Sequence, residues 1–115
     1  MTDEELRSEI QSIISVASET NLFLTQIHQQ KVTQTFASEH LRYLDQQNDE
    51  TLSDLTKASG TQGNDSILRE TRAEARQLSA ELATLSTSVN KHSFDSANRI
   101  AQILDKAHEL RTALR

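Results

Sequence analysis

Apolar residues recur at helical spacing along almost the whole chain. In the first half they step by three and four residues, the repeat that lets one helix bury a narrow seam against another. This seam weakens over residues 28–35 and then resumes in a slipped frame. The pattern predicts helix from about residue 3 to residue 58. The members of this first seam are Leu6, Ile10, Ile13, Ala17, Leu24, Ile27, Ala37, Leu41, Leu44, Leu55 and Ala58.

A second seam follows the only clear loop, residues 59–65, which contains both glycines of the chain. It weakens through residues 90–96, where Ser93 is a good helix-capping residue, and then resumes. The pattern predicts helix over residues 65–115, either continuous or broken near Ser93. The members of this second seam are Leu68, Ala75, Leu78, Leu82, Leu85, Val89, Ile100, Ile103, Ala107, Leu110 and Leu114.

The two arms are nearly equal in length, which predicts a long antiparallel hairpin folded at the loop. In that register Leu44 faces Leu78, and residues 37–58 pack against 67–89. The charges agree with this register, and they select orientation more than they stabilise. The acidic residues Asp49, Glu50 and Asp54 lie opposite Arg69, Arg72 and Arg76.

Further apolar residues lie off the two seams, and a lone two-helix hairpin would leave them exposed. We therefore expect two hairpins to pair as a homodimer and to form a four-helix bundle. The alternative breaks the arms at their weak middle and gives a compact three- or four-helix bundle within one chain. The off-seam residues are Ile14, Val16, Leu22, Phe23, Val32, Phe36, Tyr43, Leu52 and Leu104.

The composition is consistent with helices and excludes several function classes. The 115 residues indicate a single domain, residues 1–115, and proline is absent. Cysteine is also absent, so disulfide and thiolate chemistry are impossible. No apolar run approaches the roughly 18 residues of a membrane span. The acidic N-terminus lacks a signal-peptide pattern, so we expect a cytoplasmic protein without membrane contacts.

Charge is unevenly distributed along the chain, whose net charge is −5. Residues 1–58 hold ten acidic and four basic groups, a net −6, whereas residues 59–115 hold seven acidic and eight basic groups, a net +1. An acidic chain without a basic arm argues against a nucleic-acid partner.

The main candidate for chemistry is the weak middle of the arms, where the hairpin register brings His28, His92 and Asp95 to one level. A buried layer of this kind would be pH-sensitive. The favoured interpretation is a hydrated polar layer that fixes register. The spacing of Asp105 and His108 fits two metal ligands on one helix face, but the chain has no Glu-x-x-His motif. We assign no metal, cofactor or catalytic set.

The sequence therefore predicts a non-catalytic helical interaction or assembly module that acts through coiled-coil-type packing. Its partner would be a second copy of the chain or another helical protein, received on a surface that comprises Phe23, Val32, Phe36 and Tyr43. The alternative function is a small-ligand- or metal-binding bundle with its site at the polar middle layer.

Overall fold

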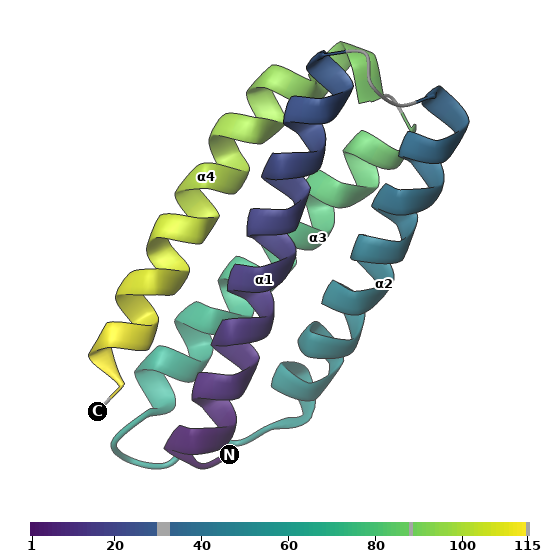
Figure 1. The fold of residues 1–115 in the computed structure, drawn as a ribbon. Helices are drawn as coiled ribbons and strands as arrows, with labels where there is room; N and C mark the ends of the chain where they lie inside the picture. Colours follow the sequence, from purple (N-terminus) through teal and green to yellow (C-terminus); the bar gives the residue numbers. More distant parts are fainter. Residues whose placement is uncertain (30–32, 88, 115) are drawn as a thin grey trace.

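The described residues form four α-helices that lie side by side (Figure 1). The computed structural model describes residues 1–29, 33–87 and 89–114, and for residues 87 and 89–94 it describes the backbone alone. No strand occurs among these residues. The helices are α1 (Asp3–His28), α2 (Gln34–Lys57), α3 (Asp65–Thr87) and α4 (Val89–Ala113).

The four helices form a closed bundle in which each helix packs against the next and α4 packs against α1. The long dimension of the molecule is 47 Å. An unbroken helix of 55 residues would span about 80 Å at a rise of 1.5 Å per residue. The prediction of two continuous arms is therefore wrong, and the alternative, a compact bundle of four helices within one chain, describes the fold.

The first arm breaks where its apolar seam disappears. Helix α1 ends at His28, and α2 begins at Gln34 with Thr33 as its N-cap. The hydroxyl oxygen of Thr33 accepts a hydrogen bond from the backbone N–H of Phe36 at 3.2 Å. Because polar residues gain little burial by staying helical, a capped break at this level costs the chain little.

The second arm divides earlier than the capping signal predicted. Helix α4 begins at Val89, so Ser93 lies inside a helix and does not begin one. The resulting α4 has 25 residues and α1 has 26, so the two helices match in length and can pack along their whole extent.

The core contains the predicted seam residues together with part of the off-seam set. Leu44 and Leu78 have no exposed surface, and Ile14, Val16 and Phe23 from the off-seam set are also buried. Each such side chain contributes about 1.5–3 kcal/mol by leaving water. Folding into four helices within one chain thus buries residues that the hairpin would have left for a dimer. The large apolar side chains that remain exposed among the described residues are Leu22, Phe36 and Tyr43.

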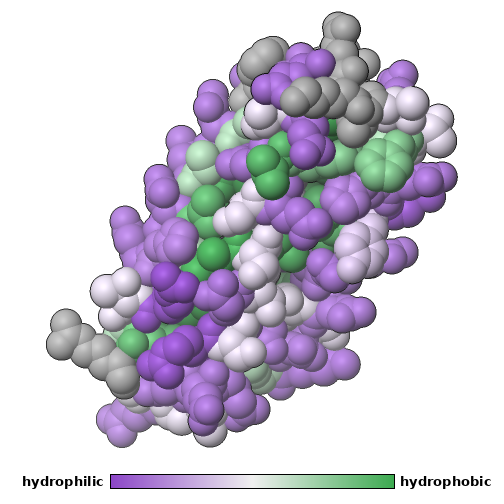
Figure 2. Space-filling model, viewed as in Figure 1, coloured by the Kyte–Doolittle hydropathy of each residue, from purple (hydrophilic) through white to green (hydrophobic). Residues whose placement is uncertain are grey.

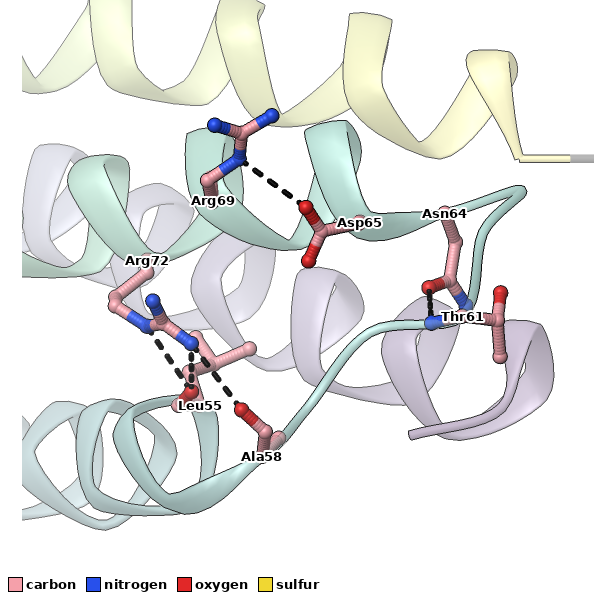
Figure 3. A network of polar contacts seen from close by, with 7 residues as sticks. All are labelled: Leu55, Ala58, Thr61, Asn64, Asp65, Arg69 and Arg72. Atoms are coloured by element: carbon pink, nitrogen blue, oxygen red, sulfur yellow. Dashed lines mark hydrogen bonds and ion pairs between the residues drawn. The ribbon is translucent and has the colours of Figure 1, made fainter.

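The interface between α2 and α3 is closed by hydrogen bonds to the main chain as well as by leucines. The buried amide of Asn48 donates to the carbonyl oxygen of Ala75 at 2.9 Å. At the end of α2, the Arg72 guanidinium donates to the Leu55 carbonyl at 2.8 and 3.1 Å and to the Ala58 carbonyl at 3.3 Å (Figure 3). A cation at a helix C-terminus is favourable because the free carbonyls there carry partial negative charge.

The arginines of α3 do not form the predicted pairs with the acidic residues of α2. Arg72 contacts carbonyl oxygens, and Arg69 forms an ion pair with Asp65 of its own helix at 3.5 Å (Figure 3). The carbonyls at the end of α2 need a donor, so they compete with the carboxylates for Arg72.

The α2–α3 loop is fixed to the start of α1 by one buried side chain. The Asn64 carbonyl oxygen accepts from the Thr61 backbone N–H at 2.7 Å (Figure 3). Its amide nitrogen donates to the Asp3 carboxylate at 2.8 Å and to the Met1 carbonyl at 3.1 Å. Gly60 is required by space, since a Cβ there would lie 2.7 Å from the Asp65 Cα atom.

Candidate interaction surface

The loosest side of the bundle is the one formed by α1 and α2. Within the described residues, these two helices contact each other less than any other neighbouring pair. A groove of about 740 Å³ runs along this side, and its lining includes Ser8, Ser12 and Ser15 of α1 with Gln47 and Glu50 of α2. Figure 2 shows this face, with weakly polar side chains along α1 and apolar patches on both sides of them. We call it the α1–α2 face.

An array of aromatic rings extends this face toward the end of the bundle at which α1 ends and α2 begins. Phe36, His40 and Tyr43 of α2 lie on one helix face, and we call them the aromatic ladder. The His40 ring is 6.1 Å from the Phe36 ring, with an interplanar angle of 2°, and 6.1 Å from the Tyr43 ring. Phe23 of α1 lies beneath, 4.5 Å from His40. Phe36 and Tyr43 remain 52% and 50% exposed, so half of each ring surface is open.

Polar contacts connect the aromatic ladder to α1 and to the groove. The Nε2 atom of His40 lies 3.4 Å from a carboxylate oxygen of Glu19, an ion pair when the imidazole is protonated. The amide of Gln47 donates to the Tyr43 hydroxyl at 2.7 Å, and Gln47 also lines the groove. The ladder and the groove are therefore parts of one continuous surface.

At the other end of the α1–α2 face two carboxyl groups meet. Glu9 of α1 and Asp54 of α2 line a second hollow of about 470 Å³ together with Glu5 and Lys57. Partial burial, together with the charge and the hydrogen bond of Asp54, raises the pKa of Glu9 to about 7. Like charges thus oppose close packing of α1 on α2 once Glu9 ionises.

The opposite side of the bundle shows complementary charges instead. Glu81 of α3 forms an ion pair with Arg99 of α4, and Glu70 of α3 pairs with Lys106 of α4 at 3.3 Å. The Glu70–Lys106 pair is partly exposed and contributes little stability. The sign of both pairs nevertheless favours contact between α3 and α4, whereas the Glu9–Asp54 pair opposes contact between α1 and α2 when Glu9 is ionised.

The residues of the predicted interaction surface differ in their exposure. Phe36 and Tyr43 lie on the α1–α2 face and are half-exposed, as the prediction requires. Phe23 is buried at the base of the ring cluster, so its inclusion as a surface residue is wrong. It packs inward because α1 and α2 belong to the same bundle. Val32 lies outside the described residues.

His40 and Glu19 were missed by the sequence analysis, although one signal was present. Phe36, His40 and Tyr43 are spaced by four and three residues, which places three rings in a row on one helix face. The partnership with Glu19 had no such signal, because it depends on α1 and α2 folding back on each other.

The predicted polar layer lies at an end of the bundle and not in its middle. His28 is the last residue of α1 and is exposed, and Asp95 is exposed on α4. The side chain of His92 lies outside the described residues. The alternative of a buried, pH-sensitive layer is therefore wrong for His28 and Asp95, because the arms fold back at this level and open it to solvent.

Two other expectations concern metals and membranes. Within the described part of the chain, no group of three or more His, Cys, Asp and Glu side chains is arranged to hold a metal ion. His108 is one of the two residues whose spacing was considered for a metal site, and its Nδ1 atom contacts Arg111 at 3.3 Å. None of the helices among these residues has both the length and the apolar character needed to cross a membrane.

Comparison with known proteins adds no relative to this description. No protein-family model, no curated protein and no solved structure matches the chain. The function has to be inferred from the α1–α2 face itself, since it combines exposed rings, a groove and unbalanced charge on one side of a closed bundle.

Proposed function

We propose that this protein is a non-catalytic helical interaction module whose α1–α2 face receives a helix of a partner. The observation that supports the proposal is the half-exposed aromatic ladder, which continues directly into a groove on the loosest side of the bundle. The partner is a second copy of the chain, as a homodimer, or another helical protein.

The aromatic ladder has surface left to bury. Tyrosine and phenylalanine contribute large apolar areas at a small cost in side-chain entropy, and such residues dominate the free energy of many interfaces. The ring stack holds Phe36, His40 and Tyr43 in place before binding. A partner helix would therefore find ordered rings next to a groove, and little further ordering would be needed.

Position-specific photo-crosslinking in the cells that produce the protein tests this proposal. Replacing Tyr43 with p-benzoylphenylalanine keeps an aromatic ring at the centre of the ladder. On irradiation we expect a discrete covalent adduct, either with a second copy of the chain or with one other protein.

The matched control places the same photo-reactive residue at Gln102, which is exposed on α4. We expect no discrete adduct from that position. Equal crosslinking at both positions, or none at Tyr43, would count against an interaction surface on the α1–α2 face. The size of the adduct distinguishes a second copy from another protein.

A further inference from the structure

We infer that the occupant of the α1–α2 face is a basic amphipathic helix from another protein, and not a second copy of this chain. The inference rests on the proposed function, because it takes the face to be an interaction surface and then identifies the chemistry of its partner. Three features carry it: the distribution of charge, the engagement of the nearby cations and the geometry of the exposed rings.

Acidic groups occur at every level of the α1–α2 face. Glu9 and Asp54 lie in the hollow at one end, Glu4 and Glu50 line the groove, and Glu19 lies beside the aromatic ladder. The two helices belong to residues 1–58, which carry a net charge of −6, while residues 59–115 carry +1. The negative charge of the molecule is thus concentrated in the half of the chain that forms this face.

The two arginines that line the groove are already engaged in hydrogen bonds to the protein. Arg111 donates to the side chain of Gln11 at 2.7 Å. Arg7 donates to the Leu114 carbonyl at 3.4 Å. Their charges offset those of Glu4 and Glu50 within the groove. The excess negative charge of the face therefore lies with Glu19 beside the ladder and with Glu5, Glu9 and Asp54 in the hollow, which outnumber Lys57 and the N-terminal ammonium group there. A face of this kind attracts a positively charged surface and steers its approach.

The same charges disfavour pairing with a second copy. A two-fold dimer through this face would bring together two copies of the same net-negative surface, because the surface meets itself. Like charges brought together at an interface suppress association. A helix with lysine or arginine along its edges meets no such opposition.

The rings supply the remaining complementarity. From Phe36 to Glu50 the face extends about 21 Å along α2, the length of a helix of roughly 15 residues. Phe36 and Tyr43 offer apolar surface to a leucine stripe. Their exposed ring faces also attract the ammonium and guanidinium groups of flanking basic residues. The face is therefore fitted to a short helix that is apolar along one side and basic at its edges.

The experiment uses three synthetic helical peptides of about 20 residues and the full chain. The first has a leucine face flanked by lysine and arginine. The second keeps the leucines but carries glutamate on the flanks, and the third scrambles the first so that its apolar face is lost. Amide chemical shifts map the contact, and fluorescence anisotropy gives the affinity at low and high salt.

We expect the basic peptide to shift amides of α1 and α2 around Ser12, Glu19 and Tyr43, with an affinity that falls as salt rises. The glutamate peptide should not bind. The double variant Phe36→Ala/Tyr43→Ala should bind the basic peptide at least about tenfold more weakly, because two anchor rings are removed. Gln102→Ala on α4 is the control and should bind as the wild type does. Circular dichroism confirms that each variant is folded.

Three results would overturn the inference, and they separate it from the proposed function. If light scattering shows a dimer and dilution shifts the same amides, the occupant is a second copy and the interaction surface remains. If the glutamate or scrambled peptide binds as well as the basic one, the face does not recognise a basic amphipathic helix. If the chain is monomeric and no peptide shifts the α1–α2 amides, both the inference and the proposed function fail.

Discussion

Helix α2 takes part in two antiparallel interfaces, and they differ in almost every respect. Toward α3 it presents buried leucines and the Asn48 amide, and Arg72 of α3 closes its C-terminal carbonyls. Toward α1 it presents rings that are only half-covered and a carboxylate that faces another carboxylate. One edge of α2 is thus packed into the core of the bundle, while its other edge keeps exposed surface that a partner could bind.

The largest expected effect on stability comes from the interface between α2 and α3. Leu78→Ala should lower the free energy of unfolding by about 2–5 kcal/mol, because it leaves a cavity at a position with no exposed surface. Chemical denaturation measures the change. The control is Leu22→Ala on α1, a residue that is 64% exposed and whose truncation should change stability by less than about 0.5 kcal/mol. Similar losses at both positions would mean that burial does not distinguish them.

The next effect tests how the free carbonyl groups at the C-terminus of α2 are hydrogen-bonded. Arg72→Met keeps much of the side-chain volume but removes the donors to the Leu55 and Ala58 carbonyls. We expect a loss of about 1–2 kcal/mol, since charge-assisted hydrogen bonds are stronger than neutral ones. Arg69→Met, which removes only an exposed pair within α3, should cost a few tenths of a kcal/mol. Equal losses in the two variants would contradict the special role of Arg72.

The pH dependence of the unfolding free energy tests the interface between α1 and α2. The pKa of Glu9 is raised from 4.5 to about 7 in the folded protein, so the folded state holds a proton that the unfolded chain releases. The unfolding free energy should therefore fall as the pH rises from about 4.5 to above 7. Glu9→Gln should flatten this decline and be more stable at pH 8 by about 1 kcal/mol, a value reduced for solvent screening.

The matched control for the titration is Glu109→Gln, which alters an exposed carboxylate on α4. It should keep the decline of the wild type over the same pH range. A wild-type protein whose stability is flat between pH 5 and 8 would show that Glu9 and Asp54 do not oppose the packing of α1 on α2.

The smallest effect on stability is expected at the ladder. Tyr43→Ala should change the unfolding free energy by no more than about 0.5 kcal/mol, because half of the side chain is already in water. Phe23→Ala, in the same ring cluster but buried, should cost about as much as Leu78→Ala. A large loss of stability for Tyr43→Ala would show that the aromatic ladder stabilises the fold. There would then be no reason to regard it as a binding surface.

Much of the local structure could be predicted from the sequence. The two seams identified residues that are now buried, such as Leu41 and Leu82. A capping box is present at the start of α1, where Thr2 and Glu5 exchange hydrogen bonds of 3.1 Å. These features depend on spacing and on near neighbours, and both are fully written in the sequence.

The sequence pattern did not show that each arm folds back on itself as two antiparallel helices. A seam that packs within one chain has the same spacing as a seam that packs between two chains, so the residues around His28 and Ser93 fitted both folds. The Glu19–His40 and Glu9–Asp54 contacts follow from that return. They join residues with no periodic relationship, so no local pattern could indicate them. The facing of Leu44 and Leu78 stays a prediction, which a disulfide between cysteines at these positions would test.

The chain separation of the helix contacts has a consequence for how the bundle assembles. Asn48 and Ala75 are 27 residues apart, whereas Gln11 and Arg111 are 100 apart. The entropy lost on closing a loop grows with its length, by about 1.2 kcal/mol between these two separations. We expect the hairpin of α2 and α3 to form early and the contact between α1 and α4 to form late. The two ends of the chain would then be the last parts of the bundle to come together, although they lie side by side in the finished fold.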